Sequence, residues 1–180
     1  MLPTRSDELG VSNMNMIVLA IFPVMMAFCA AYDLLTMRIP NWLSAVLIGG
    51  FIVAAILAGF PLEMIGMHFV AFAIALAVCF LLFIPGWIGG GDAKFAASTV
   101  LWMGMGFALP YLLYAAIAGG IFTALILAFR KYLNATQLPK WEWLQKLHDP
   151  KVGVPYGIAL AIAALIVFPH TNIFTALIVS

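Results

Sequence analysis

Charged side chains are scarce in this sequence of 180 residues. Asp, Glu, Lys and Arg make up only 8% of it, whereas 66% of the residues are hydrophobic. A soluble domain carries about 25% charged and about 45–50% apolar residues, so the composition excludes an ordinary soluble protein. The apolar runs are too continuous for the alternating pattern of barrel strands. The sequence therefore predicts an all-α polytopic membrane protein.

Residues that bind metals or act as nucleophiles are also few. The two cysteines, Cys29 and Cys79, lie far apart inside apolar runs, which excludes a disulfide framework or a zinc site. The three histidines are dispersed, and no serine is placed with a histidine and an acid. We therefore expect no metal, no cofactor and no serine or cysteine nucleophile. We also expect no nucleic-acid partner.

Six apolar runs follow one another along the chain, and about 20 helical residues are enough to cross the hydrocarbon core of a bilayer. They cover residues 16–35, 42–59, 64–84, 93–109, 110–129 and a segment that begins at about residue 155. We therefore expect six transmembrane helices. In the fifth connection, the tryptophan spacing of residues 139–148 predicts a short interfacial helix. Whether residues 173–180 complete the sixth span or rest on the membrane surface stays open.

Lysine and arginine gather in three of the connections between these runs. Arg5 lies in the N-terminal tail, and the other seven of the eight basic residues lie in the first, third and fifth connections. These seven are Arg38, Lys94, Arg130, Lys131, Lys140, Lys146 and Lys151. By the positive-inside rule, these connections are cytoplasmic and both termini lie outside. The sequence thus predicts a multi-pass protein of the cytoplasmic (inner) membrane.

Two acidic residues lie at span ends on the predicted cytoplasmic side. Asp33 ends the first span, and Asp92 begins the fourth, behind Gly89, Gly90 and Gly91. An ionisable residue at the edge of a hydrophobic span is costly, which makes it a candidate functional residue. Glycines allow positive φ angles and a close approach of another backbone. We therefore expect the glycine loop to deliver Asp92 to a partner.

The chemistry of such a pair depends on how close the two carboxylates come. Within a few ångströms of each other, Asp33 and Asp92 would share one proton. One carboxylate could then take a proton from water while the protonated one polarises a carbonyl, as in aspartic proteases. The spacing leaves an alternative equally open, in which they are separate interfacial acids satisfied by water or by Arg38 and Lys94.

Three motifs extend from the first span to the sixth. They are Asp33 followed by Arg38-Ile39-Pro40-Asn41, then Gly89-Gly90-Gly91-Asp92-Ala93-Lys94-Phe95, then Val154-Pro155-Tyr156-Gly157-Ile158-Ala159-Leu160-Ala161. Together they resemble the type IV prepilin peptidase family, GxGD-type aspartic proteases of the membrane. The resemblance implies that Asp33 and Asp92 are the catalytic pair. It also implies that prepilins or pseudopilins are the substrates, cut at the cytoplasmic membrane face behind a short basic leader.

The resemblance is to one branch of that family. Large members resemble a fusion with an N-terminal methyltransferase segment that carries paired cysteine motifs, and this chain has no such motifs. It is similar to the short, peptidase-only branch serving tight-adherence (Flp-type) pili, or to archaeal preflagellin peptidases. We therefore expect one membrane-embedded peptidase domain over residues 1–180 and no methyltransferase domain. The lipid bilayer and a pilus assembly machinery would be its further partners.

Two other classes of function compete with the peptidase. One is a proton-coupled transporter component, in which acids at span ends relay protons; symmetric repeats would favour it. No repeat relates residues 1–92 to residues 93–180. The other is a non-catalytic pilus assembly factor.

Polar residues near the two acids have expected roles of their own. Lys94 does not share a helical face with Asp92, two positions before it, so we expect it to be a snorkelling anchor. Arg38 is expected to be an anchor too. Asn41 is expected to cap the second helix, with a substrate contact as a secondary role. His68, near the start of the third span, is expected to be an interfacial polar residue.

The third motif has two possible roles. Pro155, Tyr156 and Gly157 could hold an open backbone that pairs with an extended substrate strand. They could equally be a plain helix start, with proline near the first turn. The sequence does not decide between them. We therefore take these three residues, together with Asn41, Lys94 and Gly89 to Gly91, as candidates for substrate binding or loop shaping.

Overall fold

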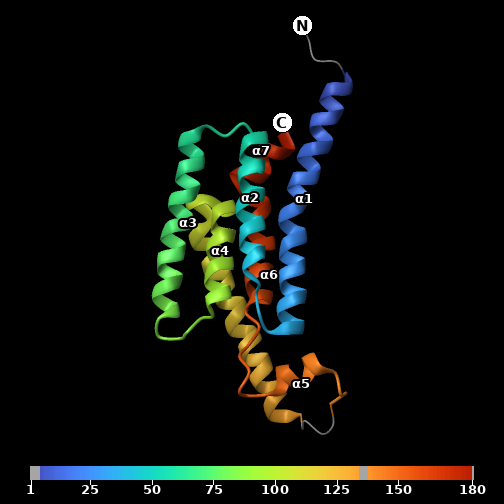
Figure 1. Ribbon diagram of the computed structural model, residues 1–180, viewed down its shortest axis with the longest axis vertical. Helices are drawn as coiled ribbons and strands as arrows, with labels where there is room; N and C mark the ends of the chain where they lie inside the picture. The colour runs from blue at the N-terminus through green and yellow to red at the C-terminus, as the bar shows by residue number, and fades with distance from the viewer. Residues whose placement is uncertain (1–4, 134–137, 180) are drawn as a thin grey trace.

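The computed structural model describes residues 5–133 and 138–179, with side chains from residue 14 onward. Every regular element in these two ranges is a helix, which confirms the all-α prediction. The helices are α1 (Arg5–Thr36), α2 (Asn41–Leu57), α3 (Leu62–Phe83), α4 (Gly90–Tyr132), α5 (Glu142–His148), α6 (Gly157–Val167), the 3-10 helix η2 (Phe168–His170) and α7 (Asn172–Val179) (Figure 1).

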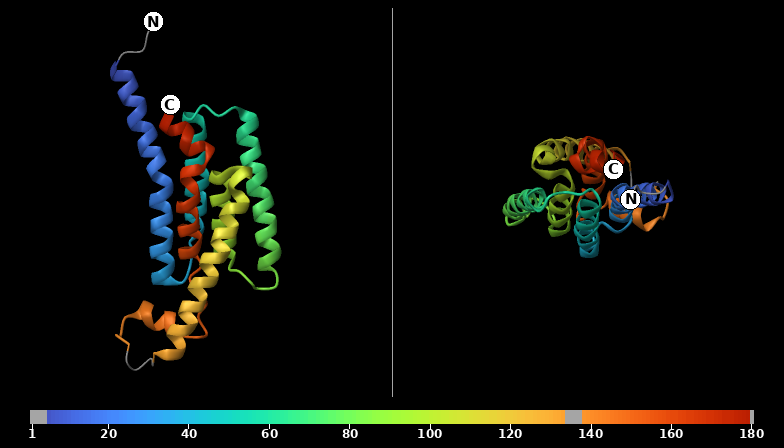
Figure 2. Two further views of the ribbon diagram at one scale, coloured as in Figure 1. Left: turned by 180° about the vertical axis from the view of Figure 1, so that it is seen from behind. Right: turned by 90° about the horizontal axis from the view of Figure 1, so that it is seen from above.

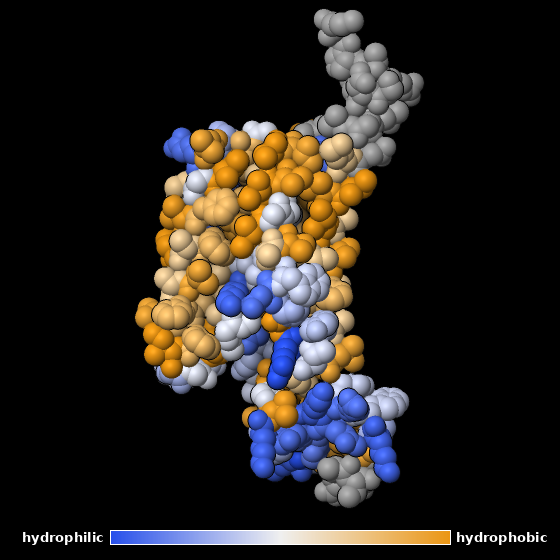
Figure 3. Space-filling view, viewed as in Figure 1, coloured by the Kyte–Doolittle hydropathy of each residue, from blue (hydrophilic) through white to orange (hydrophobic). Residues whose placement is uncertain are grey.

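The long helices form one bundle with two different ends (Figures 1 and 2). The α1–α2 turn and the α3–α4 connection lie at one end, and α5 projects beyond it. The start of α1, the α2–α3 turn and α7 lie at the other end. Between the ends the visible surface is mostly apolar, while hydrophilic residues gather around α5 (Figure 3). Exposed residues such as Ile56 and Leu109 match a lipid environment, where hydrocarbon is the solvent.

Helix α4 is broken at Gly104. This residue has φ 69° and ψ 176°, which interrupts the helical path. The chain then turns back about midway along the bundle (Figure 1). Ala96 before the break and Ala115 after it line the same cavity, as two antiparallel halves would. We predicted the boundary between the fourth and fifth spans at Pro110. The structure instead places Pro110 inside the second half and the break six residues earlier.

Fewer helices than the six expected are long and apolar enough to span a membrane. Among the described residues, three helices are long and apolar enough: residues 14–36 of α1, the whole of α3, and α4 counted as one helix. The pair formed by residues 157–170 and α7, bent by 52°, would make a fourth. Helix α2 is apolar but has only 17 residues. The count of six is therefore not confirmed.

The first half of α4 is fixed against α1, α2 and α3 by buried contacts. Trp102 is fully buried, and its Nε1 donates a hydrogen bond of 2.9 Å to the carbonyl oxygen of Leu47 in α2. Its ring packs against Phe22 of α1 at a centroid distance of 5.1 Å. His68 of α3 is only 4% exposed, so the expectation that it is interfacial is wrong. These contacts hold in place the half-helix that begins near Asp92.

The predicted short helix in the fifth connection is present as α5. It spans Glu142–His148, seven residues within the 139–148 stretch expected from the sequence. Arg130, near the end of α4, donates from Nε to the carbonyl oxygen of Leu147 at 2.8 Å and from Nη2 to that of Val152 at 3.1 Å. The Arg130 guanidinium thus links the polar connection to α4. The C-terminal end of this connection leads into α6.

Candidate active site

Asp33 lies near the end of α1 and is buried, with 3% of its surface exposed. Its Oδ2 accepts a hydrogen bond of 2.7 Å from the backbone N–H of Gly157. Gly157 is the first residue of α6, where N–H groups have no partner within the helix and carry partial positive charge. The carboxylate of Asp33 therefore caps the N-terminus of α6, which begins more than a hundred residues later in the sequence.

Asp92 lies in the first turn of α4, three residues after the N-cap Gly89. Its Oδ2 accepts a hydrogen bond of 3.2 Å from the Gly89 N–H. A Cβ on Gly89 would lie only 2.7 Å from that oxygen, so a larger residue here would displace the Asp92 carboxylate. Both aspartates are thus held by backbone N–H groups at helix N-termini, one by α6 and one by α4.

Ile39 brings these two helix starts together. A Cβ on Gly91 would lie 2.9 Å from the carbonyl oxygen of Ile39, and a Cβ on Gly157 would lie 3.0 Å from its Cδ1. The turn between α1 and α2 therefore packs directly on the bare backbone of α4 and α6. Met37 adopts φ 56° in this turn, and its N–H donates to the carbonyl oxygen of Asp33 at 2.7 Å, which ends α1.

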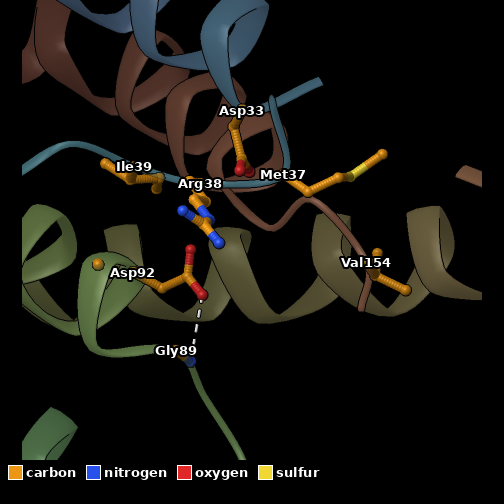
Figure 4. Close-up of a pocket in the computed structure, with 8 residues that line it drawn as sticks. Asp33, Met37, Arg38, Ile39, Gly89, Asp92 and Val154 are labelled. Carbon is orange, nitrogen blue, oxygen red and sulfur yellow. Dashed lines mark hydrogen bonds between the residues drawn. The ribbon is translucent and has the colours of Figure 1, made fainter. Parts of the chain in front are cut away.

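A cavity of about 270 Å³ lies between the two aspartates. Figure 4 shows the carboxylates of Asp33 and Asp92 pointing toward one another across it, with the Arg38 guanidinium between them in this view. The lining residues are Asp33, Met37, Arg38, Ile39, Gly89, Gly91, Asp92 and Val154. A water molecule takes about 30 Å³ of liquid, so the cavity has room for water and for part of a peptide.

Lys94 and Asn41 join two helices beside this cavity and do not line it. Lys94 Nζ donates a hydrogen bond of 3.0 Å to Asn41 Oδ1, and both side chains are exposed. The expectation that Asn41 caps α2 is wrong, because Pro40 is the N-cap and Asn41 is the first helical residue. The pair links the first turns of α2 and α4, a positioning contact that the sequence could not predict, since the residues are far apart along the chain.

The other candidate residues take different places. Gly90 faces the ring of Phe83 rather than the aspartates. Pro155 is buried before α6, and Tyr156 is the N-cap of that helix. Tyr156 borders a second cavity, which Asp92 also lines. The third motif is therefore a helix start whose first N–H is taken up by Asp33; whether its backbone also binds substrate stays a prediction.

Four residues that line the cavity were not candidates from the sequence: Met37, Arg38, Ile39 and Val154. All except Met37 belong to the quoted motifs, so the signal was present. The expectation that Arg38 is an anchor stays a prediction, whereas its place in the cavity of the aspartates agrees with the alternative in which it satisfies the two acids. Its position follows from the left-handed turn at Met37, which no residue pattern announces.

The arrangement suits acid–base chemistry on a polar substrate group. Two carboxylates face one cavity, and each is oriented by a backbone N–H. A pair of this kind can hold a proton on one member and accept a proton with the other. Within the described ranges, no group of three or more His, Cys, Asp and Glu side chains is placed to hold a metal ion.

Comparison with known proteins adds a family to this geometry. A family model described as the type IV leader peptidase family matches residues 20–124, more than half of the chain. The match includes both aspartates, the turn after α1 and the glycine loop. Searches of curated proteins and of solved structures gave no match. On its sequence and its paired carboxylates, the chain belongs to the type IV leader peptidase family.

Proposed function

We propose that the protein is a membrane aspartic endopeptidase that removes the leader peptide of type IV prepilins or pseudopilins. The observation that carries this proposal is the single cavity lined by Asp33 and Asp92, which belong to different helices. Membership of a leader peptidase family supports peptide hydrolysis. The two oriented carboxylates supply what hydrolysis without a covalent intermediate needs.

In this mechanism the two aspartates divide the acid–base work. One carboxylate accepts a proton from a water molecule in the cavity, and the water oxygen attacks the carbonyl carbon of the peptide bond. The other carboxyl group donates a hydrogen bond to the carbonyl oxygen, on which negative charge develops. The first carboxyl group then passes the proton that it took from water to the leaving nitrogen as the C–N bond breaks, and the carbonyl re-forms as a carboxylic acid. The Arg38 guanidinium, in the same cavity, adds a positive charge near the developing oxyanion.

The proposal extends to topology and domain organisation. We propose that residues 1–180 form one membrane-embedded peptidase domain. The count of six spans stays a prediction: it takes α1, α2, α3, each half of α4 and the bent α6–α7 pair as one span each, although the two halves of α4 meet about midway along the bundle. The basic connections around α5 and the aspartates face the cytoplasm. A broken helix is tolerated at membrane depth where protein buries it, and Gly104 is buried.

The dyad is tested by Asp33→Asn and Asp92→Asn. Each variant loses either the group that accepts the proton from water or the group that holds the shared proton. General acid–base catalysis is worth roughly 10²–10⁴-fold per role, so each should lower the rate of prepilin cleavage by at least about 100-fold. Because the pair acts as a unit, the double variant should be no slower than either single one. The measurement is leader cleavage of a prepilin encoded in the same genome, co-expressed with the protein.

Glu63→Gln provides the control for charge removal. Glu63 is exposed in the first turn of α3, at the end of the bundle away from the aspartates. Its variant should cleave at the normal rate, and all variants should be inserted in the membrane in equal amounts. Activity should also survive chelators and serine-directed reagents. Normal cleavage by either Asp→Asn variant would contradict the aspartic mechanism and favour a transporter component or a non-catalytic assembly factor.

A further inference from the structure

Arg130 holds three carbonyl oxygens with one side chain. It lies near the end of the second half of α4. Its Nε donates to the carbonyl oxygen of Leu147 at 2.8 Å, and its Nη2 donates to those of Val152 at 3.1 Å and Gly153 at 3.2 Å. None of these three acceptors is a carboxylate, so the contact is a directed set of hydrogen bonds and not an ion pair. The planar fork of a guanidinium can satisfy several acceptors in a fixed geometry, which an ammonium group cannot do.

Two of these carbonyls belong to the stretch that leads into the candidate active site. Val152 and Gly153 are followed by Val154, which lines the cavity of the aspartates. Gly157, three residues further on, donates its N–H to Asp33. The residues just before α6 have no regular secondary structure, so no helix or sheet hydrogen bonds of their own keep them in place. Contacts from other elements must therefore fix this stretch.

The second half of α4 holds the same stretch at a second point. Thr123 Oγ1 donates a hydrogen bond of 3.2 Å to the Tyr156 hydroxyl. The Tyr156 ring lies against the backbone of Gly119, since a Cβ there would be 3.1 Å from its Cε1. Gly119, Thr123 and Arg130 are spaced i, i+4 and i+11, which places them on one face of the helix. One helix face therefore holds both ends of the stretch that precedes α6.

Helix α4 thus acts on both aspartates, one with each half. Its first half carries Asp92 itself. Its second half holds the residues before Gly157, whose N–H orients the Asp33 carboxylate. A shift of this stretch would move the N–H, and with it the Asp33 carboxylate, relative to Asp92. Arg130 does not line the cavity, so its route to the reaction is through this stretch.

We propose that Arg130 is a positioning residue of the peptidase: its guanidinium fixes the stretch before α6 and, through it, the Gly157 N–H that orients Asp33. This inference rests on the proposed function and adds to it a residue outside the cavity. The competing role is purely structural, in which the bond to Leu147 only keeps α5 folded against α4. The two roles differ in what the loss of Arg130 does to the rate of the chemical step.

The test compares Arg130→Gln and Arg130→Lys with Lys131→Gln in prepilin cleavage. Lys131, the next residue, is exposed, and its Nζ lies 5.5 Å from the centroid of the Tyr132 ring. Both Arg130 variants should lower kcat by at least about tenfold and leave KM within about twofold, since a displacement of about 1 Å in a catalytic group can cost about 100-fold. Arg130→Lys keeps the charge and loses the fork, so it should lose as much as Arg130→Gln. Lys131→Gln should cleave normally.

Two further measurements separate positioning from stability. In Arg130→Ala, millimolar guanidinium should restore part of the lost kcat by occupying the vacated space, whereas methylammonium should not. Gly157→Ala should show no such rescue. In the double variant Arg130→Gln, Gly157→Ala, the loss of kcat should be smaller than the product of the two single losses, because both changes act on one hydrogen bond. A role confined to the stability of α5 would give neither result.

Each contrary outcome overturns the inference. Normal kcat in the Arg130 variants, a loss confined to KM, no rescue by guanidinium, or losses that multiply in the double variant would mean that Arg130 does not act through Gly157. If both Arg130→Gln and Arg130→Lys fail to insert in the membrane while Lys131→Gln inserts, Arg130 serves folding alone. These results leave the proposed function intact, because the unmodified protein still cleaves. If the unmodified protein cleaves no prepilin, the proposed function falls together with this inference.

Discussion

The absence of a Cβ atom at Gly91 and Gly157 lets the segments that carry the two aspartates pack together. A Cβ on Gly157 would lie 2.8 Å from Asp33 Oδ2 and 3.0 Å from Asp33 Cβ. A Cβ on Gly91 would lie 2.9 Å from the Ile39 carbonyl oxygen. Glycine is therefore needed at these two positions because a side chain would clash with Asp33 or Ile39, and not because the backbone needs a positive φ angle. The turn after α1 can contact α4 and α6 only because both present bare backbone.

Gly157→Ala and Gly91→Ala should both reduce cleavage. The added methyl group pushes the Asp33 carboxylate or the Ile39 backbone away, and a displacement of about 1 Å in a catalytic group can cost about 100-fold. We expect losses of at least about tenfold in leader cleavage. The matched controls are Gly153→Ala and Gly120→Ala, because a Cβ at either position meets nothing within 4 Å. Equal activity in all four variants would contradict the close packing.

At the scale of elements, the feature that shapes the site is the break in α4. The last carbonyl groups of a helix have no partner within it, and Leu101 lies three residues before Gly104. His68 Nδ1 donates a hydrogen bond of 2.7 Å to the Leu101 carbonyl oxygen. A Cβ on Gly104 would lie 2.8 Å from His68 Cε1. A histidine from α3 thus caps the first half-helix and occupies the space that the glycine leaves.

His68→Ala and Gly104→Ala should destabilise the protein. The first leaves a void and an unpaired buried carbonyl, which we estimate at about 3 kcal/mol. The second forces an alanine into a backbone conformation with φ 69° and ψ 176°, a region that is essentially restricted to glycine, at about 1–3 kcal/mol, in addition to a clash with His68. At about 2–4 °C per kcal/mol for a chain of this size, the melting temperature in detergent should fall measurably.

Two further variants separate the cap from general disruption. In His68→Asn the amide nitrogen can replace Nδ1 as the donor to Leu101, so part of the lost stability should return. Gly106→Ala lies two residues beyond the break, where a Cβ meets nothing within 4 Å, and should melt normally. If Gly106→Ala and Gly104→Ala melt alike, the break at Gly104 is not the origin of the effect.

For the whole molecule, the two ends of the bundle differ in chemistry. The end of α1, which carries Asp33, the start of α4, which carries Asp92, and α5 lie at one end, and the α2–α3 turn lies at the other (Figure 1). This arrangement agrees with the alternation of lysine and arginine along the chain. A bilayer around the apolar middle would leave the two ends on opposite sides.

Single cysteines at Glu63 and Lys140 test this orientation in a Cys29→Ala, Cys79→Ala background. Both native cysteines are buried, and both target residues are exposed. Glu63→Cys should react with an impermeant thiol reagent from outside, and Lys140→Cys only after permeabilisation. Reaction of both from the same side would contradict the bundle orientation. Reversed sides would place the aspartates at the outer face.

The sequence by itself determined the class of the protein and its candidate acids. Scarce charge and long apolar runs indicated helices in lipid. In lipid every backbone N–H and C=O group must find its hydrogen-bond partner within the protein, and a helix provides one. The basic residues placed Asp33 and Asp92 at one depth. The short helix around residues 142–148 also followed from its tryptophan spacing. These are local properties, which composition and periodicity report directly.

Only the tertiary structure decided how the site is assembled. The contacts of Asp33 with Gly157, of Ile39 with Gly91 and of Lys94 with Asn41 join residues far apart in sequence. The spacing of apolar residues along the chain cannot predict such contacts, because they depend on which helices are neighbours in the bundle. For the same reason the break in α4 was expected at Pro110. Proline is favoured in the first turn of a helix, which is why a fifth span was expected to begin there, whereas Gly104 breaks α4 with a histidine from another helix packed against it.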